Sequence, residues 1–225
     1  MAAVHSGSSD LASSLTDLMT SLAVIFVLLL VASLNNMQQK TKQTVNDILV
    51  KLREQLQEYA VSGVEVRTDP KDPLGLLVLV PEGLLQFQRN FDVIPPQGVD
   101  FLDKFSPKLA LTACSTQFRD EINSIVIEGH ADSSGDEEKI NLPLSQRRSM
   151  AVVTGALQAL KKTEPPEQSN DLRGCFLKFL SASGRGSEEL VLTDGKEDPE
   201  KSRRVIFKIR VRSLEQRRVV TLLGG

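Results

Sequence analysis

An apolar run over residues 15–34, LTDLMTSLAVIFVLLLVASL, most constrains what this chain can fold into. A helix over this run spans about 30 Å, which is the thickness of the hydrocarbon core of a bilayer. We therefore predict a single membrane helix over residues 15–34. Residues 1–14 are small and polar and contain no Lys or Arg, so they predict a tail and not the positive start of a cleaved signal peptide.

One carboxylate, Asp17, lies inside the apolar run. An ionisable group in a membrane helix costs about 2.5–3.5 kcal/mol at the helix centre and less near an end, so it needs a polar partner or a path to water. Asp17 is therefore a candidate functional residue. The alternative is that Asp17 caps the helix at the membrane interface.

Composition limits the rest of the chain. The 225 residues, 40% hydrophobic and 25% charged, leave room for one membrane helix, one connector and one domain. The net charge of -2 gives no reason to expect bound nucleic acid, and a chain with no Trp and a single Tyr offers no platform on which bases could stack.

Residues 35–75 predict a helical connector that ends in a hinge. No Gly or Pro interrupts residues 35–60, and larger side chains recur there at spacings of four, three, four and three: Val45, Leu49, Leu52, Leu56 and Tyr59. Such a stripe fits a coiled-coil seam in a parallel dimer, or a helix lying against the surface of the domain itself. The following TDPKDPLG, residues 68–75, predicts a hinge into the globular part.

Residues 76–213 read as one domain, followed by a tail over residues 214–225. Apolar runs predict strands at residues 76–80, 124–128, 176–182 and 204–211, with residues 84–87 as a continuation or partner strand. Helical spacing predicts helices over residues 96–116 and 144–161. This order predicts an α+β sandwich with helices on one face of a mixed sheet.

The segment IEGHADSSGDEEKINLPLSQRRSMAVVTGAL, residues 127–157, resembles the peptidoglycan-binding domain shared by OmpA, Pal and MotB. The matching residues are Gly129, His130, Asp132, Gly135, Asn141, Leu144, Ser145 and Arg148. The resemblance extends over about residues 76–211 and implies an OmpA-like βαβαββ domain. The chain departs from the family in having Ala131 in place of Thr, Ser202 in place of Asn, and a Gly-to-Asn interval about one residue longer.

The resemblance implies a binding site for a cell-wall stem peptide, whose side chain ends in an ammonium and a carboxylate on one carbon. Asp132 would take the ammonium and Arg148 would take the carboxylate as a planar fork. Asn141 and Arg204 are assigned to the same peptidoglycan-binding site. Without the resemblance, the residues favour Asp132 capping the following turn and Arg148 in a surface ion pair.

Metal, cofactor and enzymatic roles are not expected. His130 and Asp132 could suggest a metal pair, but no third ligand stands at a useful spacing. The only cysteines, Cys114 and Cys175, form an even count that allows a disulfide in an oxidising compartment, with two buried free thiols as the alternative.

The membrane helix carries a second resemblance. Asp17, Leu18, Met19 and Thr20 match the stator pattern of MotB proteins, an Asp followed by apolar residues and then Thr. The resemblance implies that Asp17, with Thr20, translocates H⁺, with Na⁺ as the alternative ion. It also implies a homodimer of this chain inside a ring of a MotA-like multi-span membrane subunit.

The flagellar members of this family usually have a basic N-terminal tail and a longer linker with a plug helix. Compact stators occur in the Zorya anti-phage defence system, and the chain is similar to the B subunits of that system. The resemblance implies a cell-wall-anchored stator subunit of a proton-driven motor in anti-phage defence. The alternatives are a flagellar-type MotB stator and a passive OmpA-like tether that conducts no ion.

Two arguments about orientation conflict. Positive charges follow the apolar run, at Lys40, Lys42, Lys51 and Arg53, and the positive-inside rule would then place the C-terminal domain in the cytoplasm. The family resemblance places the domain at the cell wall. We therefore expect a single-pass protein of the bacterial inner membrane, with a cytoplasmic N-terminus and a periplasmic C-terminal domain.

Overall fold

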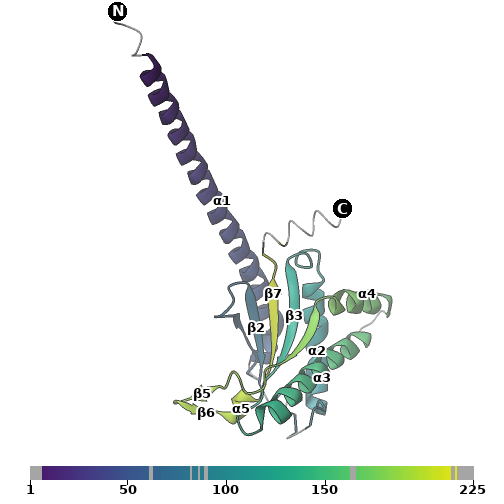
Figure 1. The fold of residues 1–225 in the computed structure, drawn as a ribbon. Helices are drawn as coiled ribbons and strands as arrows, with labels where there is room; N and C mark the ends of the chain where they lie inside the picture. Colours follow the sequence, from purple (N-terminus) through teal and green to yellow (C-terminus); the bar gives the residue numbers. More distant parts are fainter. Residues whose placement is uncertain are drawn as a thin grey trace, which may run out of the picture. The chain divides into compact units, whose positions relative to one another are not determined.

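The computed structural model describes residues 7–60, 63–81, 83–85, 87–88, 91–162, 166–213 and 216, with the backbone alone at residues 7–12, 58–60 and 166–170. The chain divides into two compact units, Met1–Lys42 and Gln43–Gly225. Helix α1, Gly7–Ala60, begins in the first unit and ends in the second (Figure 1). It contains no Pro and no Gly after its first residue, which explains its length.

The first unit presents an apolar helix surface. The large apolar side chains of residues 15–34 are between 48% and 68% exposed. Within the described residues, α1 is the one helix long and apolar enough to cross a membrane. The helix starts at Gly7, before the predicted start of the membrane span at residue 15.

From Gln43 onward, α1 belongs to the second unit and packs into its core. The buried side chains on this part of the helix are Val45, Ile48, Leu49, Leu52 and Leu56. The Thr112 hydroxyl on α2 donates a 2.7 Å hydrogen bond to the Gln55 side-chain oxygen. The apolar stripe is therefore buried against the domain itself, the second of the two alternatives. The Tyr59 side chain lies outside the described residues.

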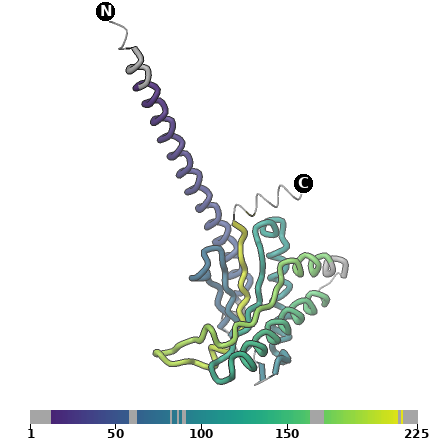
Figure 2. Tube along the Cα trace, viewed as in Figure 1, coloured from purple at the N-terminus to yellow at the C-terminus, as the bar shows by residue number. Residues whose placement is uncertain are grey.

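The sheet of the second unit has five strands. They are β1, Glu65–Thr68, β2, Gly75–Val80, β3, Ile122–Gly129, β4, Leu180–Gly184, and β7, Val205–Val211. Their order across the sheet is β1-β2-β7-β3-β4, so the last strand in the sequence is the central one (Figure 2). Only β3 and β4 are parallel to each other, and the sheet is mixed as predicted.

One face of this sheet carries the core. The register pairs Phe207 with Val78 on one side and with Ile127 on the other, and all three side chains are buried. Helices α2, Pro96–Ala113, and α3, Leu142–Lys161, lie on this face (Figure 1). The ring of Phe105 on α2 meets the ring of Phe207 edge-on at 4.9 Å. The predicted α+β sandwich with helices on one face is therefore confirmed.

Smaller elements complete the domain. Helix α4, Pro166–Leu177, precedes β4, and a π-helical turn η1, Glu137–Asn141, precedes α3. A hairpin of β5, Leu192–Thr193, and β6, Lys196–Glu197, leads into the short helix α5, Pro199–Ser202. A disulfide joins Cys114, just after α2, to Cys175 in α4.

Three local predictions were wrong. Residues 68–75 form the turn of the β1–β2 hairpin and not a hinge, because the Asp69 amide donates to the Gly75 carbonyl at 2.8 Å. The described part of residues 84–87 is not a strand, because the amides of Leu84 and Leu85 turn back to the Pro81 carbonyl. The strand predicted over residues 176–182 starts only at Leu180, because Phe176 lies in α4.

Candidate functional site

A groove with a volume of about 750 Å³ lies where the C-terminal end of β3 meets η1, α3 and α5. Its lining includes three of the four residues predicted to bind peptidoglycan, Asp132, Asn141 and Arg148. Apolar side chains such as Phe87 and Leu144 line other parts of it. The groove therefore combines charged and apolar walls.

The end of β3 is shaped by a close approach of α3. A Cβ atom on Gly129, the last residue of β3, would lie 2.3 Å from the Ser145 carbonyl oxygen, a distance that no side chain tolerates. Glycine at this position lets the first turn of α3 pack against the strand. The loop that follows β3 and the start of α3 are thereby brought to one groove.

Asp132 follows β3 and is held by two partners. Its Oδ1 accepts hydrogen bonds from the Ser134 amide, at 2.9 Å, and from the Ser134 hydroxyl. Its Oδ2 lies 2.5 Å from the guanidinium of Arg203. Burial acts to raise the pKa of Asp132, but the hydrogen bonds from Ser134 and Arg203 outweigh it and hold the pKa below its ordinary value. Asp132 is therefore an oriented, ionised carboxylate.

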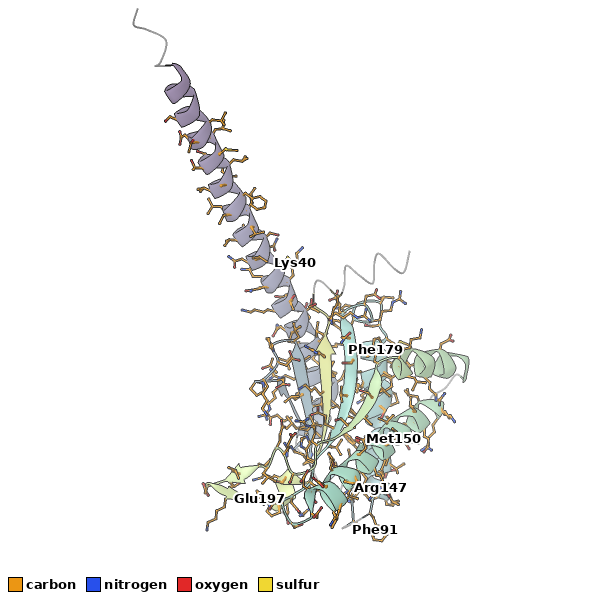
Figure 3. All side chains as sticks on the ribbon, viewed as in Figure 1. Lys40, Phe91, Arg147, Met150, Phe179 and Glu197 are labelled. Carbon is orange, nitrogen blue, oxygen red and sulfur yellow. A yellow bond between two sulfur atoms is a disulfide. The ribbon has the colours of Figure 1, made fainter. Side chains whose placement is uncertain are left out.

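Arg148 is buried, with 5% of its surface exposed. Its Nε donates to the Phe91 carbonyl and its terminal nitrogen to the Gln88 carbonyl, both at 3.1 Å. Its guanidinium also lies over the ring of Phe87. The residue that we predicted as a fork for a ligand carboxylate thus holds the backbone that precedes α2. Figure 3 labels Phe91 and Arg147, the residue that precedes Arg148 in α3.

Asn141 shapes the loop of the groove. Its side-chain nitrogen donates to the carbonyls of Asp132 and Gly135, both at 3.0 Å. It is the last residue of the π-helical turn η1. A π-helical turn holds one residue more than an α-helical turn, which accommodates the longer interval between Gly135 and Asn141 in this sequence.

Arg204 lies outside the lining of the groove, and Arg203 lines it instead. The Arg204 guanidinium donates to the carbonyls of Glu189, at 3.0 Å, and Ser202, at 3.3 Å. Burial lowers the pKa of Arg204, with partial compensation by Glu189. Both arginines precede β7, and both also line a small pocket beside Phe87 and His130.

His130 follows β3 directly and does not line the groove. It is 1% exposed, and burial, with the nearby Arg204, lowers its pKa to about 3. Neither ring nitrogen has a hydrogen-bond partner among the described residues. The described residues also contain no cluster of three His, Cys, Asp or Glu side chains that could hold a metal. His130 is a neutral ring in the native protein.

Asp17 and Thr20 lie one turn apart on α1, in the first unit. The Thr20 hydroxyl donates to the carbonyls of Thr16, at 3.0 Å, and Asp17, at 2.9 Å. The Asp17 side chain is exposed. Residues three and four apart share a helix face, so the carboxylate of Asp17 and the hydroxyl of Thr20 face the same side of α1.

Comparison with known proteins shows which solved structures have a similar fold. Neither a family model nor a curated protein matches the sequence. Among solved structures, a MotB-like protein from Desulfovibrio vulgaris is 22% identical, with a TM-score of 0.53 and coverage of 78% of this chain and 99% of that one. The periplasmic domain of Helicobacter pylori MotB is 16% identical, with a TM-score of 0.50 and coverage of 72% of this chain and 87% of that one.

At these identities the likeness establishes the fold. The chain therefore joins a long N-terminal apolar helix to a C-terminal domain of the MotB/OmpA-like fold.

Proposed function

We propose that this chain is a cell-wall-anchored stator subunit of a proton-driven motor in the bacterial inner membrane, working in anti-phage defence. One observation carries the proposal. Asp17 lies in an apolar helix of membrane length, and the same helix continues into a domain of the MotB/OmpA-like fold. A tether needs the helix and the domain, but it has no need for the carboxylate.

Asp17 supplies the ion-carrying group of the proposed motor. One elementary charge that crosses 100 mV releases about 2.3 kcal/mol, which is available to turn one part of the motor against another if protonation changes the partner of the carboxylate. The partner in this proposal is a ring of a MotA-like multi-span subunit around a dimer of this chain. The transported ion is H⁺, and Na⁺ is the alternative that the flux assay tests. The mechanism needs no covalent chemistry in this subunit.

In this proposal, the groove binds the cell wall and so anchors the domain. A stem-peptide side chain ends in one ammonium and one carboxylate, and the groove offers the carboxylate of Asp132 and the guanidinium of Arg203. The likeness to the periplasmic domain of MotB supports placing this domain in the periplasm and the N-terminus in the cytoplasm.

The test is the Asp17→Asn variant, expressed together with the MotA-like partner. Asn keeps the size of Asp and lowers the cost of membrane insertion, so the complex should assemble at least as well as wild type. Ion flux and phage protection should both be lost. The matched control is Asp47→Asn, on the same helix but outside the apolar run, where both should persist.

Retained flux in an assembled Asp17→Asn complex would contradict the motor and leave the passive tether. Restored swimming in cells that lack their flagellar stator, without phage protection, would assign the chain to the flagellar alternative. Flux measured at fixed membrane potential with and without Na⁺ identifies the ion.

A further inference from the structure

We infer that Glu137 and Glu197 are positioning residues of the groove, and that together they clasp two of its walls into one fixed arrangement. The first wall belongs to the β3–α3 segment, residues 130–141, and the second to the β4–β7 segment, residues 185–204. Each segment contributes one serine and one glutamate to this clasp. The inference rests on the proposed binding of peptidoglycan and names residues that keep the binding site in shape.

The first half of the clasp runs from the β3–α3 segment to the β4–β7 segment. The carboxylate of Glu137, in η1, accepts hydrogen bonds from the Ser187 amide, at 3.1 Å and 3.2 Å, and from the Ser187 hydroxyl. The hydrogen bond from the hydroxyl lowers the pKa of Glu137 below its ordinary value, so the acceptor is ionised at neutral pH. Gly186, with a φ of +52°, leaves the room for this contact, because a Cβ atom there would overlap the Glu137 carboxylate.

The second half of the clasp runs in the opposite direction. Glu197, the last residue of β6, is labelled in Figure 3. Its Oε1 accepts from the Ser133 amide at 2.9 Å, and its Oε2 accepts from the Ser133 hydroxyl. Each half thus pairs one carboxylate with both the amide and the hydroxyl of one serine. Hydrogen bonds to an ionised acceptor are stronger than those between neutral groups, and two donors fix the direction of the carboxylate.

The clasp holds the groove from outside. None of its four residues is among the described residues that line the groove. Ser133 directly follows Asp132, which lines the first wall, and Glu197 lies two residues before Pro199, which lines the second. The clasp therefore fixes the backbone within one or two residues of the lining, and a ligand in the groove leaves its hydrogen bonds in place.

An ion pair between Asp132 and Arg203 also links the two walls. Both of these side chains line the groove, so their positions depend on what the groove contains. The clasp does not share this dependence. Walls that are already fixed before binding lower the cost of ordering that a ligand would otherwise meet, and this raises affinity.

The test compares Glu137→Ala, Glu197→Ala and the double variant, each in the full-length chain in detergent. Hydrogen exchange followed by mass spectrometry reports on residues 131–137 and 186–197. In the double variant, exchange should become about tenfold faster or more in both ranges, because the amides of Ser133 and Ser187 lose their acceptors. Sedimentation with isolated cell walls should show binding about tenfold weaker, because the ligand then has to order the walls.

Further variants separate positioning from folding. Glu137→Gln keeps one acceptor oxygen, so its binding should lie between that of wild type and that of Glu137→Ala. The matched control is Glu138→Ala, at the exposed neighbouring carboxylate, which should behave as wild type. The midpoint of urea unfolding should stay at the wild-type value in every variant, because the hydrogen bonds of the clasp lie at the surface.

Wild-type binding by a double variant with faster exchange would overturn the inference, because loose walls would then bind as well as clasped ones. Unchanged exchange would overturn it too, since the walls would be held without the clasp. A loss of binding that accompanies a lower urea midpoint would assign both glutamates to folding and not to positioning. Wild type that does not sediment with cell walls would overturn the proposed anchoring function, and the exchange rates would still decide whether the clasp holds the walls.

Discussion

The guanidinium of Arg148 lies over the ring of Phe87, with 5.1 Å between the guanidinium carbon and the ring centroid. Its nitrogens hold the carbonyls of Gln88 and Phe91 at the same time. One side chain from α3 therefore organises the backbone that leads into α2, and the wall of the groove depends on it.

Arg148→Gln should lower the stability of the domain. Two hydrogen bonds from a charged donor, to the carbonyls of Gln88 and Phe91, are lost at about 1.5–3 kcal/mol each, and the packing on Phe87 is lost as well. Urea unfolding followed by circular dichroism measures the change. Arg147→Gln, its exposed neighbour, should stay within about 0.5 kcal/mol of wild type. Equal stability of the two variants would show that Arg148 is not a structural residue.

His130 should make the domain less stable in acid. Burial and the neighbouring Arg204 lower its pKa from 6.5 to about 3, so between these values the unfolded chain binds a proton that the folded ring does not. The free energy of unfolding is highest above the unfolded pKa and should fall by about 1.4 kcal/mol for each pH unit below it. Urea unfolding between about pH 7 and pH 5 measures this slope.

His130→Phe keeps an aromatic ring and removes the titration. Its unfolding free energy should no longer fall over the same pH range, because carboxylates with lowered pKa values, such as Asp69 and Asp132, titrate in more acidic solution. Burial raises the pKa of Glu128, and that shift favours the folded chain as the pH falls. An unchanged slope in this variant would mean that another group carries the pH dependence.

The end of α1 should contribute to the stability of the domain. Leu52 is 1% exposed in the core, so Leu52→Ala should cost about 2–5 kcal/mol in chemical denaturation. Val50 lies on the same helix and is exposed, and Val50→Ala should cost less than about 0.5 kcal/mol. If both substitutions had the same small effect, the apolar stripe would be free to form a coiled-coil seam.

The disulfide between Cys114 and Cys175 should stabilise the native domain. It closes a loop with a sequence separation of 61, and its removal should cost about 2–5 kcal/mol. The double variant Cys114→Ser/Cys175→Ser and the reduced wild type should melt at the same, lower temperature. Thiol labelling of the unfolded, unreduced protein should give no signal, and two reactive thiols would contradict the bond.

Periodicity was enough to predict the main elements of the domain. Val205, Phe207, Ile209 and Val211 alternate along β7, and all four are buried on one face. Helices α2 and α3 were found within a few residues of their observed ends because their buried positions recur at helical spacing. One side of each of these elements packs against the core, so apolar residues recur along the sequence at the spacing of a strand or a helix.

Short and marginal elements left weaker signals. Strand β1 has one buried residue, Val66, and an edge strand with a single buried side chain shows no alternation to detect. The Pro and Gly residues of TDPKDPLG mark a turn in either interpretation, and only the pairing of β1 with β2 distinguishes a hairpin from a hinge. The Asp194-Gly195 pair, both with positive φ, was a signal for the β5–β6 hairpin that we did not use.

The lining of the groove was predicted in part. The motif led to Asp132 and Asn141, because the loop that holds them is local in sequence. Arg203 and Arg204 are adjacent in sequence and both precede β7, so the motif alone does not tell which of them lines the groove. The role of Arg148 in holding Gln88 and Phe91 depends on contacts 57 and 60 residues away in sequence. Such distant contacts leave no local pattern.

The central position of β7 determines the order in which this domain can be completed. As the chain leaves the ribosome, β2 ends 125 residues and β3 ends 76 residues before Val205, the first residue of the strand that joins them. Until then, two apolar strands have open edges, and such edges pair readily with other chains. A nascent chain cut before residue 205 would lack the strand that closes the sheet. The last strand to be synthesised is thus the one that ends the risk of aggregation.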